Sequence, residues 1–311
     1  MKIACIGNAT FDCTLSKDTF IVEDERNSFD NISFTAGGPA SNAASVIAKF
    51  GGKVDFYGQV GNDSFGKYVY ESLINENINV DNISVSEKVM TPFSSVFINT
   101  SKSTRTICTA RSKIDYEKPK IENFNYQTDY DFILTDGKYA EDSIELVRAN
   151  PNAISIIDAG RANENVLNVC REVDYIICSQ NFAEAVTGCS LTDDYQNNVT
   201  VYQKLCTVFP NAKGITITVG KRGYICAKDN EVLINPSYNS GLPAIDTNCA
   251  GDIFHGAFTY ALANGYDYYQ ALDFANVTAS LSTTKVGGRN SCPMLSEVNK
   301  ILKNESRKRT N

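Results

Sequence analysis

The sequence predicts an α/β protein with a doubly wound, mostly parallel sheet flanked by helices and a small β lid. From residue 129 onward, short apolar runs of strand length alternate with longer helical segments, as they do in parallel sheets. Near the N-terminus, polar segments with loose alternation indicate small solvated ribbons instead. No internal repeat or linker separates the two parts, so we expect one domain over residues 1–311.

Composition narrows the class of protein. Hydrophobic residues make up 42% and charged residues 21% of the chain, which is ordinary for a globular protein. The formal net charge of −7 argues against a nucleic-acid-binding surface, and no apolar run is long enough for a membrane span. The 10 cysteines form no CxxC pair, and the sequence shows no signal-peptide pattern. Both observations are typical of cytosolic thiols. We therefore expect a cytoplasmic protein without nucleic-acid or membrane partners.

The first strand is expected at residues 2–7, a short apolar run that closes on glycine. Asp12 follows shortly after this run. Because open α/β sheets bind ligands beyond the carboxyl ends of their strands, Asp12 is a candidate substrate contact. The alternative is an aspartate that only caps a turn.

Two polar regions are predicted to form the lid. Residues 20–34 alternate loosely, as solvated strands do. Residues 94–109 contain two β-rich runs joined by a short polar stretch, which is typical of a hairpin. The lid is therefore expected from insertions at about 13–34 and 90–110. Arg105 in the hairpin faces either the substrate or solvent, and solvent is the commoner place for a strand arginine.

A Gly-Gly turn opens the first predicted helix, within residues 35–52. Gly37 and Gly38 allow a ligand and the backbone to approach closely. Asn42, in the first turns of this helix, offers both a hydrogen-bond donor and an acceptor to a polyol. These three residues are therefore candidate substrate contacts.

The second half of the chain contains four buried-strand candidates. They are short runs rich in isoleucine, and helical segments lie between them. The four runs are residues 132–134, 154–158, 175–178 and 214–219. This alternation predicts the parallel part of the sheet.

The chemistry is expected in residues 245–256, where a turn of small residues runs into an amphipathic helix that begins near Ala250. Unpaired backbone N–H groups of Cys249, Ala250 and Gly251 would bind a phosphate at the helix N-terminus. Asp252 lies beside this anion site, where a carboxylate can accept a proton from an attacking hydroxyl. The alternative is that Asp252 only stabilises the helix N-terminus.

The run Asp246-Thr247-Asn248-Cys249-Ala250-Gly251-Asp252 resembles the second signature of the ribokinase-like carbohydrate kinases, the PfkB family. The Gly-Gly turn and Asn42 resemble the first signature of that family. The resemblance covers nearly the whole chain and implies a ribokinase-like fold. It implies that Asp252 is the catalytic base and that the N–H groups of Cys249 to Gly251 form the anion hole. Cys249 stands where the family usually has glycine, so a positive φ there would carry a steric cost.

The same resemblance assigns the two substrates. Asp12, Gly37, Gly38 and Asn42 would contact a sugar. The nucleotide side would be formed by Thr218, Gly220, Gly223, Asn276 and Gly287. ATP and Mg²⁺ are implied, and a monovalent cation such as K⁺ is a further option.

The residue that would help to organise Mg²⁺ depends on how the sequence is aligned with the family motif. Asn181 and Glu184 resemble the family's asparagine-x-x-glutamate motif, which helps to organise Mg²⁺ through water. Alignment on Thr187 and Gly188 instead places that motif at Ser179 and Phe182. Glu184 is therefore either a magnesium residue or a surface acid of a helix.

The single histidine, His255, lies one helical turn after Asp252, where a proton relay can be imagined. The base of this family needs no histidine partner. We therefore expect His255 to pack rather than to relay protons.

These resemblances imply an ATP-dependent phosphotransferase that moves the γ-phosphoryl group to a hydroxyl of a small sugar. A ketose such as fructose is favoured over ribose, because residues 94–109 and 252–257 resemble the ketohexokinase and sulfofructose kinase branches. The alternatives are a nucleoside kinase of the same fold and a catalytically weak sugar-sensing relative. A dinucleotide-binding protein is disfavoured because no G-x-G-x-x-G follows the first strand. Relatives also suggest a homodimer formed through the lid.

Overall fold

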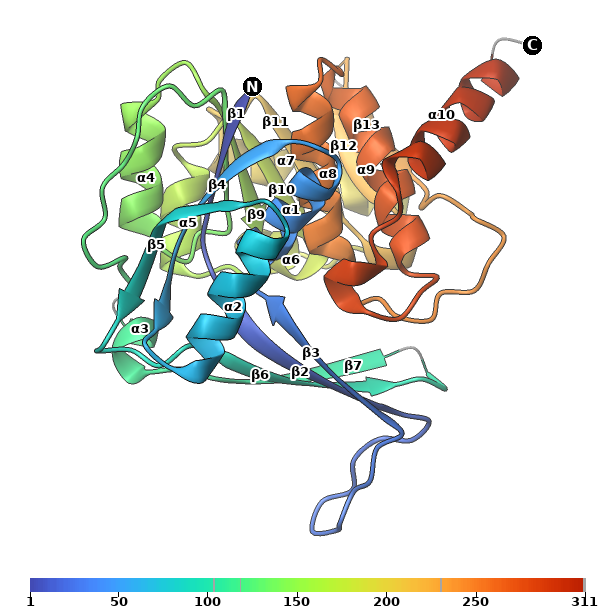
Figure 1. The fold of residues 1–311 in the computed structure, drawn as a ribbon. Helices are drawn as coiled ribbons and strands as arrows, with labels where there is room; N and C mark the ends of the chain where they lie inside the picture. The colour runs from blue at the N-terminus through green and yellow to red at the C-terminus, as the bar shows by residue number, and fades with distance from the viewer. Residues whose placement is uncertain (103, 118, 230, 310–311) are drawn as a thin grey trace.

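The computed structural model describes residues 1–102, 104–117, 119–229 and 231–309, with only the backbone of 305–309. The chain forms two sheets, and helices cover both faces of the larger one (Figure 1). The helices are α1 (Pro39–Lys49), α2 (Ser64–Asn75), α3 (Lys113–Glu117), α4 (Ala140–Ala149), α5 (Glu164–Cys170), α6 (Gln180–Thr187), α7 (Tyr195–Val208), α8 (Ala250–Ala263), α9 (Tyr268–Ser282) and α10 (Leu295–Arg309), with 3-10 turns η1 (Gly220–Arg222) and η2 (Gly288–Ser291). The strands are β1 (Lys2–Ile6), β2 (Thr10–Lys17), β3 (Asn31–Gly37), β4 (Lys53–Gly61), β5 (Asn79–Ser86), β6 (Phe93–Asn99), β7 (Thr104–Ala110), β8 (Phe132–Thr135), β9 (Ile154–Ala159), β10 (Tyr175–Ser179), β11 (Gly214–Thr218), β12 (Tyr224–Lys228) and β13 (Glu231–Asn235).

The larger sheet has nine strands in the order β13-β12-β11-β10-β9-β8-β1-β4-β5. Strand β1 pairs in parallel with β4 on one side and with β8 on the other, and the antiparallel pairs of this sheet are β11–β12 and β12–β13. The chain therefore winds outward from β1 in both directions. This confirms the predicted doubly wound, mostly parallel sheet, and ligands bind such sheets beyond the strand ends where the order reverses.

The core lies on both faces of this sheet because successive side chains of each strand point in opposite directions. In β1, Ile3 and Cys5 join the apolar cluster that includes α1, α8 and α9. Ala4 and Ile6 join the cluster on the other face, which includes α4. Helix α8 packs between α1 and α9 and also reaches β8 and β9. Its N-terminus is thereby fixed near the carboxyl ends of the central strands.

The smaller sheet has four strands in the order β3-β2-β6-β7 and fits the predicted lid. Figure 1 shows it as a separate layer below the main body. Its register places Asp12, Ser94 and Thr109 on one face. On the opposite face, Phe11 packs against Phe65 of α2. Residue 103, within the predicted hairpin connection, lies outside the described residues.

One part of the lid prediction is wrong. Residues 20–30 form a loop rather than strands, and β3 begins only at Asn31. In this loop, the Asn27 side chain accepts a hydrogen bond from Val22 N and donates to the backbone oxygens of Val22 and Glu25. Such local side-chain bonds satisfy the backbone without a neighbouring strand.

None of the described helices combines the length and the apolar character that crossing a bilayer requires.

Candidate active site

Asp12 lies in β2, on the lid face that carries Ser94. Its carboxylate accepts a hydrogen bond of 2.7 Å from the Thr10 hydroxyl. Gly37 on the paired strand leaves room for this carboxylate, because an added Cβ would lie 1.9 Å from Asp12 Oδ2. Burial raises the pKa of the Asp12 carboxyl; the Thr10 hydroxyl lowers it and the Asp252 charge raises it. Glycine at position 37 therefore leaves the space that the Asp12 carboxylate occupies.

Gly38 forms the N-cap of α1 with a φ of 98°, a conformation that favours glycine. A Cβ there would also lie 2.2 Å from the backbone oxygen of Asn8. The turn then passes into Pro39, whose fixed φ suits the first helical position. The Gly38 oxygen accepts the Asn42 N–H at 2.8 Å, so the turn places Asn42 one helical turn further on.

Asn42 connects the two signatures directly. Its Nδ2 donates to Asp252 Oδ2 at 2.6 Å and to the Cys249 sulfur at 3.3 Å. The side chain is only 2% exposed, and its Oδ1 has no hydrogen-bond partner among the described residues. A buried acceptor without a partner costs about 1–3 kcal/mol, so a hydroxyl donor from a ligand would be stabilising here. The Asp252 carboxylate of α8 therefore accepts a hydrogen bond from a side chain of α1. This contact favours the interpretation of Asp252 as a base over its interpretation as a helix cap.

Helix α8 begins at Ala250, as predicted, and the segment before it forms the candidate anion hole. In the described part of the chain, the N–H groups of Cys249 and Gly251 have no backbone acceptor. The Ala250 N–H is not entirely unpaired, contrary to the prediction, because it makes a long 3.4 Å contact with the Thr247 oxygen. Asp246 anchors the turn by accepting Asn248 N at 2.8 Å.

Cys249 adopts the left-handed conformation, with φ 61° and ψ 5°. A side chain in this region costs about 1–2 kcal/mol, and part of that is offset because glycine loses more freedom on folding. We expect Cys249→Gly to raise the free energy of unfolding by about 1 kcal/mol. Urea unfolding of both proteins measures this difference. A variant that is equally stable or less stable would contradict a strained Cys249.

The predicted nucleotide residues come from several segments: β11, the η1 turn, α9 and the stretch just before η2. Thr218 ends β11, and its hydroxyl donates to the Cys178 oxygen at 3.2 Å. Gly220 opens the η1 turn with a φ of 58°. Asn276 donates to the Pro236 oxygen at 2.9 Å, and Gly287 N donates to Asp246 Oδ2 at 3.1 Å.

Gly223 has a structural reason to be glycine. A Cβ there would lie 1.9 Å from the backbone oxygen of Asn235 in the neighbouring strand. All five nucleotide assignments remain predictions. For Gly223, close strand packing alone is enough to require the residue.

Glu184 lies half-buried on α6. Its Oε1 accepts hydrogen bonds of 2.8 Å from Gln180 Nε2 and from Leu191 N. Phe182, the position given by the alternative register, is fully buried and offers no ligand atom. The described residues contain no group of three or more acidic, histidine or cysteine side chains placed to hold a metal. Glu184 therefore remains a prediction.

Asp136 lies beside the candidate site and was not predicted from the sequence. It follows β8 and accepts hydrogen bonds from Asn8 N at 2.8 Å and from Ala40 N at 3.3 Å. It therefore joins the end of β1 to the start of α1, beside the Gly-Gly turn. Burial raises the pKa of its carboxyl, and these N–H groups lower it. The signal was present, since Asp136 is an acid directly after a predicted strand.

Two arginines connect the elements around the candidate site. Arg105 is exposed on β7, but its Nη1 donates to the Thr247 hydroxyl at 2.9 Å, so it faces the anion-hole turn. Arg289 is buried within η2 and donates to Ser41 Oγ at 3.2 Å and to Glu76 Oε1 at 2.6 Å. The first arginine links the lid to the anion hole. The second ties the segment after Gly287 to α1 and α2.

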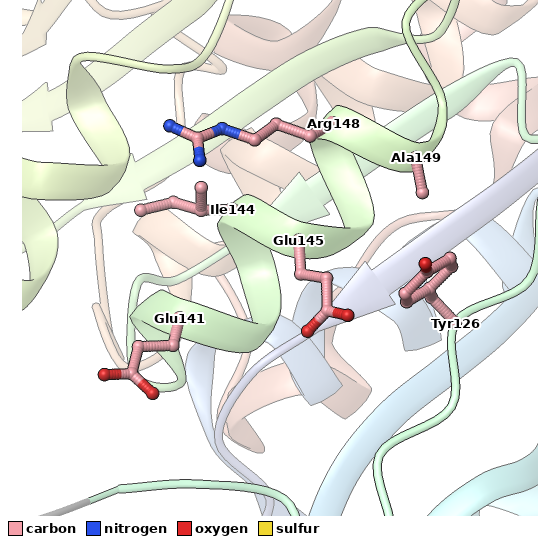
Figure 2. A pocket seen from close by; sticks show the side chains of 6 residues that line it. All are labelled: Tyr126, Glu141, Ile144, Glu145, Arg148 and Ala149. Carbon is pink, nitrogen blue, oxygen red and sulfur yellow. The ribbon is translucent and has the colours of Figure 1, made fainter.

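A separate groove of about 530 Å³ lies on the outer surface of α4 (Figure 2). It is lined by Tyr126, Glu141, Ile144, Glu145, Arg148 and Ala149. None of the candidate site residues reaches it. Arg148 is engaged by Glu172 at 2.9 Å, so the groove offers two acids and no free cation among its lining residues.

A doubly wound sheet, a β lid and a carboxylate beside a helix N-terminus are features expected of a small-molecule kinase. The chain belongs to the pfkB family of carbohydrate kinases, whose family model matches residues 1–295. It is 25% identical over 310 residues to a ribokinase from Haemophilus influenzae, covering 96% of this chain and 98% of that protein. Among solved structures, ribokinase from Thermotoga maritima matches with a TM-score of 0.78 at 23% identity, covering 97% and 99% of the chains. Arabidopsis thaliana ribokinase complexed with ribose and ATP matches with a TM-score of 0.78 at 20% identity, covering 97% and 98%.

Proposed function

We propose that this carbohydrate kinase transfers the γ-phosphoryl group of ATP to a hydroxyl of a small sugar, with Asp252 as the general base. The observation that carries the proposal is the 2.6 Å hydrogen bond from Asn42 to Asp252, next to N–H groups that lack acceptors. This hydrogen bond brings a side chain that would bind the sugar and a side chain that would accept a proton together at a helix N-terminus. That arrangement suits transfer of a phosphoryl group to an alcohol.

Each group has a distinct task in this reaction. The sugar would be held by Asp12 and by the unpaired Oδ1 of Asn42. Asp252 would accept the proton of the attacking hydroxyl, which makes the oxygen a better nucleophile. The N–H groups of Cys249 and Gly251 would stabilise negative charge that develops on the transferred group. Mg²⁺, arriving with ATP, would neutralise phosphate charge.

The sugar is proposed to be a ketose such as fructose. The support is the resemblance of residues 94–109 and 252–257 to ketose kinase branches. The competing acceptors are ribose, which the relatives' names suggest, and nucleosides. A sugar-sensing relative with little turnover is a further alternative, supported by the strained Cys249 in the anion hole.

A screen of acceptors separates these candidates. Ketoses, aldopentoses and nucleosides are each supplied with ATP and Mg²⁺, and ADP release is recorded. We expect ADP release that depends on the acceptor and is fastest with a ketohexose. A fastest rate with ribose or a nucleoside would change the substrate, and no acceptor-dependent release would favour the sensing role. Repeating the best reaction with K⁺ replaced by a larger cation tests whether the reaction depends on a monovalent cation such as K⁺.

We also propose that two copies pair through their lids in the cytoplasm. Strand β3 is an edge strand, and Ile32 and Phe34 on it are 59% and 50% exposed. Exposed apolar side chains on an edge strand favour association. Sedimentation velocity is expected to show a dimer that Ile32→Glu dissociates, whereas a wild-type monomer would contradict pairing.

The cytoplasmic location is supported by the 10 free cysteines.

A further inference from the structure

His255 is the only histidine of the chain, and its ring joins three elements at the carboxyl edge of the large sheet. Nδ1 lies 2.6 Å from the Gly251 oxygen in α8, and Nε2 lies 3.2 Å from the Ile177 oxygen in β10. The Asp158 carboxylate of β9 lies 3.4 Å from Nδ1. The residue is only 3% exposed, so its polar atoms depend on these protein partners. His255 is therefore buried, as the sequence led us to expect, and its ring also makes polar contacts.

The partners of the ring restrict where its protons are. Both nitrogens face backbone oxygens, and a carbonyl oxygen can only accept a hydrogen bond. A neutral imidazole has one N–H, so it would turn a nitrogen lone pair toward one of these oxygens. In a buried site, that leaves polar atoms unsatisfied at a substantial energetic cost. A doubly protonated ring donates to both oxygens, and Asp158 supplies the opposite charge.

We propose that His255 is a buried imidazolium paired with Asp158, and that it is a positioning residue for the anion hole and the catalytic base. The functional part rests on the proposed kinase activity. The Gly251 oxygen belongs to the same planar peptide unit as the Asp252 N–H. A ring anchored to β9 and β10 therefore holds this peptide unit at a fixed place relative to the sheet. It thereby orients the last anion-hole residue and the base together.

The surrounding charges are consistent with this pairing. Besides Asp158 of β9, the carboxylates of Asp252 in α8 and Asp136 after β8 act on the site. The pKa of the Asp158 carboxyl is raised, mainly by burial and further by the other two carboxylates, while the charge of His255 opposes the shift and favours the ionised carboxylate. The Cys178 thiol of β10 stays neutral, because burial raises its pKa well above the ordinary value. The three carboxylates thus favour a positive charge on the ring.

The single histidine makes the protonation state directly measurable. In protein labelled with ¹⁵N-histidine, NMR observes one ring. At about pH 8, where an ordinary histidine is neutral, we expect the wild-type ring to carry protons on both nitrogens. Asp158→Asn removes the counter-charge and keeps the shape, so its ring is expected to carry one proton. This measurement needs no substrate, so it stays valid even if the proposed kinase activity is wrong.

The positioning role is tested by kinetics on the same variant. We expect Asp158→Asn to lower kcat about tenfold or more with little change in the sugar KM, because a small displacement of reacting groups slows chemistry strongly. Tyr202→Phe is the matched control. It removes a buried hydroxyl of α7 that donates to the Ile215 oxygen at 2.9 Å, remote from the anion-hole turn.

Two results would overturn the proposal. A wild-type ring that carries a single proton at about pH 8 would show that His255 is not an imidazolium. A kcat for Asp158→Asn no lower than that of Tyr202→Phe would show that His255 has no positioning role. The NMR result on the wild type decides the first point even if the variant fails to fold.

Discussion

Replacing Asp252 with asparagine is expected to lower kcat by about 10²-fold or more while ATP binding is retained. Asparagine keeps the shape of the side chain and can still accept the hydrogen bond from Asn42 Nδ2. It cannot accept a proton at neutral pH, so the attacking hydroxyl loses its base. Steady-state kinetics and nucleotide titration measure both quantities on one protein.

The matched control is Asp267→Asn. Asp267 is a true helix cap, because its carboxylate accepts Gln270 N at 2.9 Å at the start of α9. Asparagine caps a helix about as well as aspartate, so this variant is expected to keep normal turnover. If Asp252→Asn behaves like Asp267→Asn, Asp252 is a stabilising acid of α8 and not the base.

Removing the Asp12 carboxylate is expected to raise the sugar KM about 10- to 100-fold and to leave the ATP KM nearly unchanged. Hydrogen bonds to charged groups contribute about 1.5–3 kcal/mol, and each 1.4 kcal/mol corresponds to a factor of ten. Asp12→Ala removes those bonds at the sugar side only. Initial rates with one substrate varied at a time separate the two constants.

Asp18→Ala controls for the loss of one negative charge from the lid. Asp18 is exposed and lies just after the far end of the same strand, β2. It is expected to leave both KM values unchanged. Equal effects of Asp12→Ala on the two KM values would contradict its assignment to the sugar.

The fold was predictable where local patterns decide the structure. The predicted strands at 132–134 and 154–158 correspond to β8 and β9, because a parallel strand buried on both faces is a short continuous apolar run. The start of α8 at Ala250 was also predicted. Residues 20–30 were not, since the Asn27 side chain replaces strand pairing there with local bonds that no periodicity reveals.

The site was predictable only in its two signatures. Asn42 and Asp252 were chosen separately, and their contact across 210 residues of sequence appears only in the folded chain. Asp136, Asp158 and Arg105 were missed as site residues or left open, because their roles depend on partners in other strands. Asp136 and Asp158 both stand at the carboxyl ends of parallel strands. Applying that rule to every strand, as was done for Asp12, would have found them.

Phosphoryl transfer to a sugar at this site is tested most directly with ATP labelled in the γ-phosphoryl group and the best acceptor from the screen. We expect the label to appear in a sugar phosphate in amounts equal to the ADP formed, and we expect Asp252→Asn nearly to abolish this product. Label recovered only as inorganic phosphate, or an equal yield of sugar phosphate from the variant, would contradict phosphoryl transfer at this site.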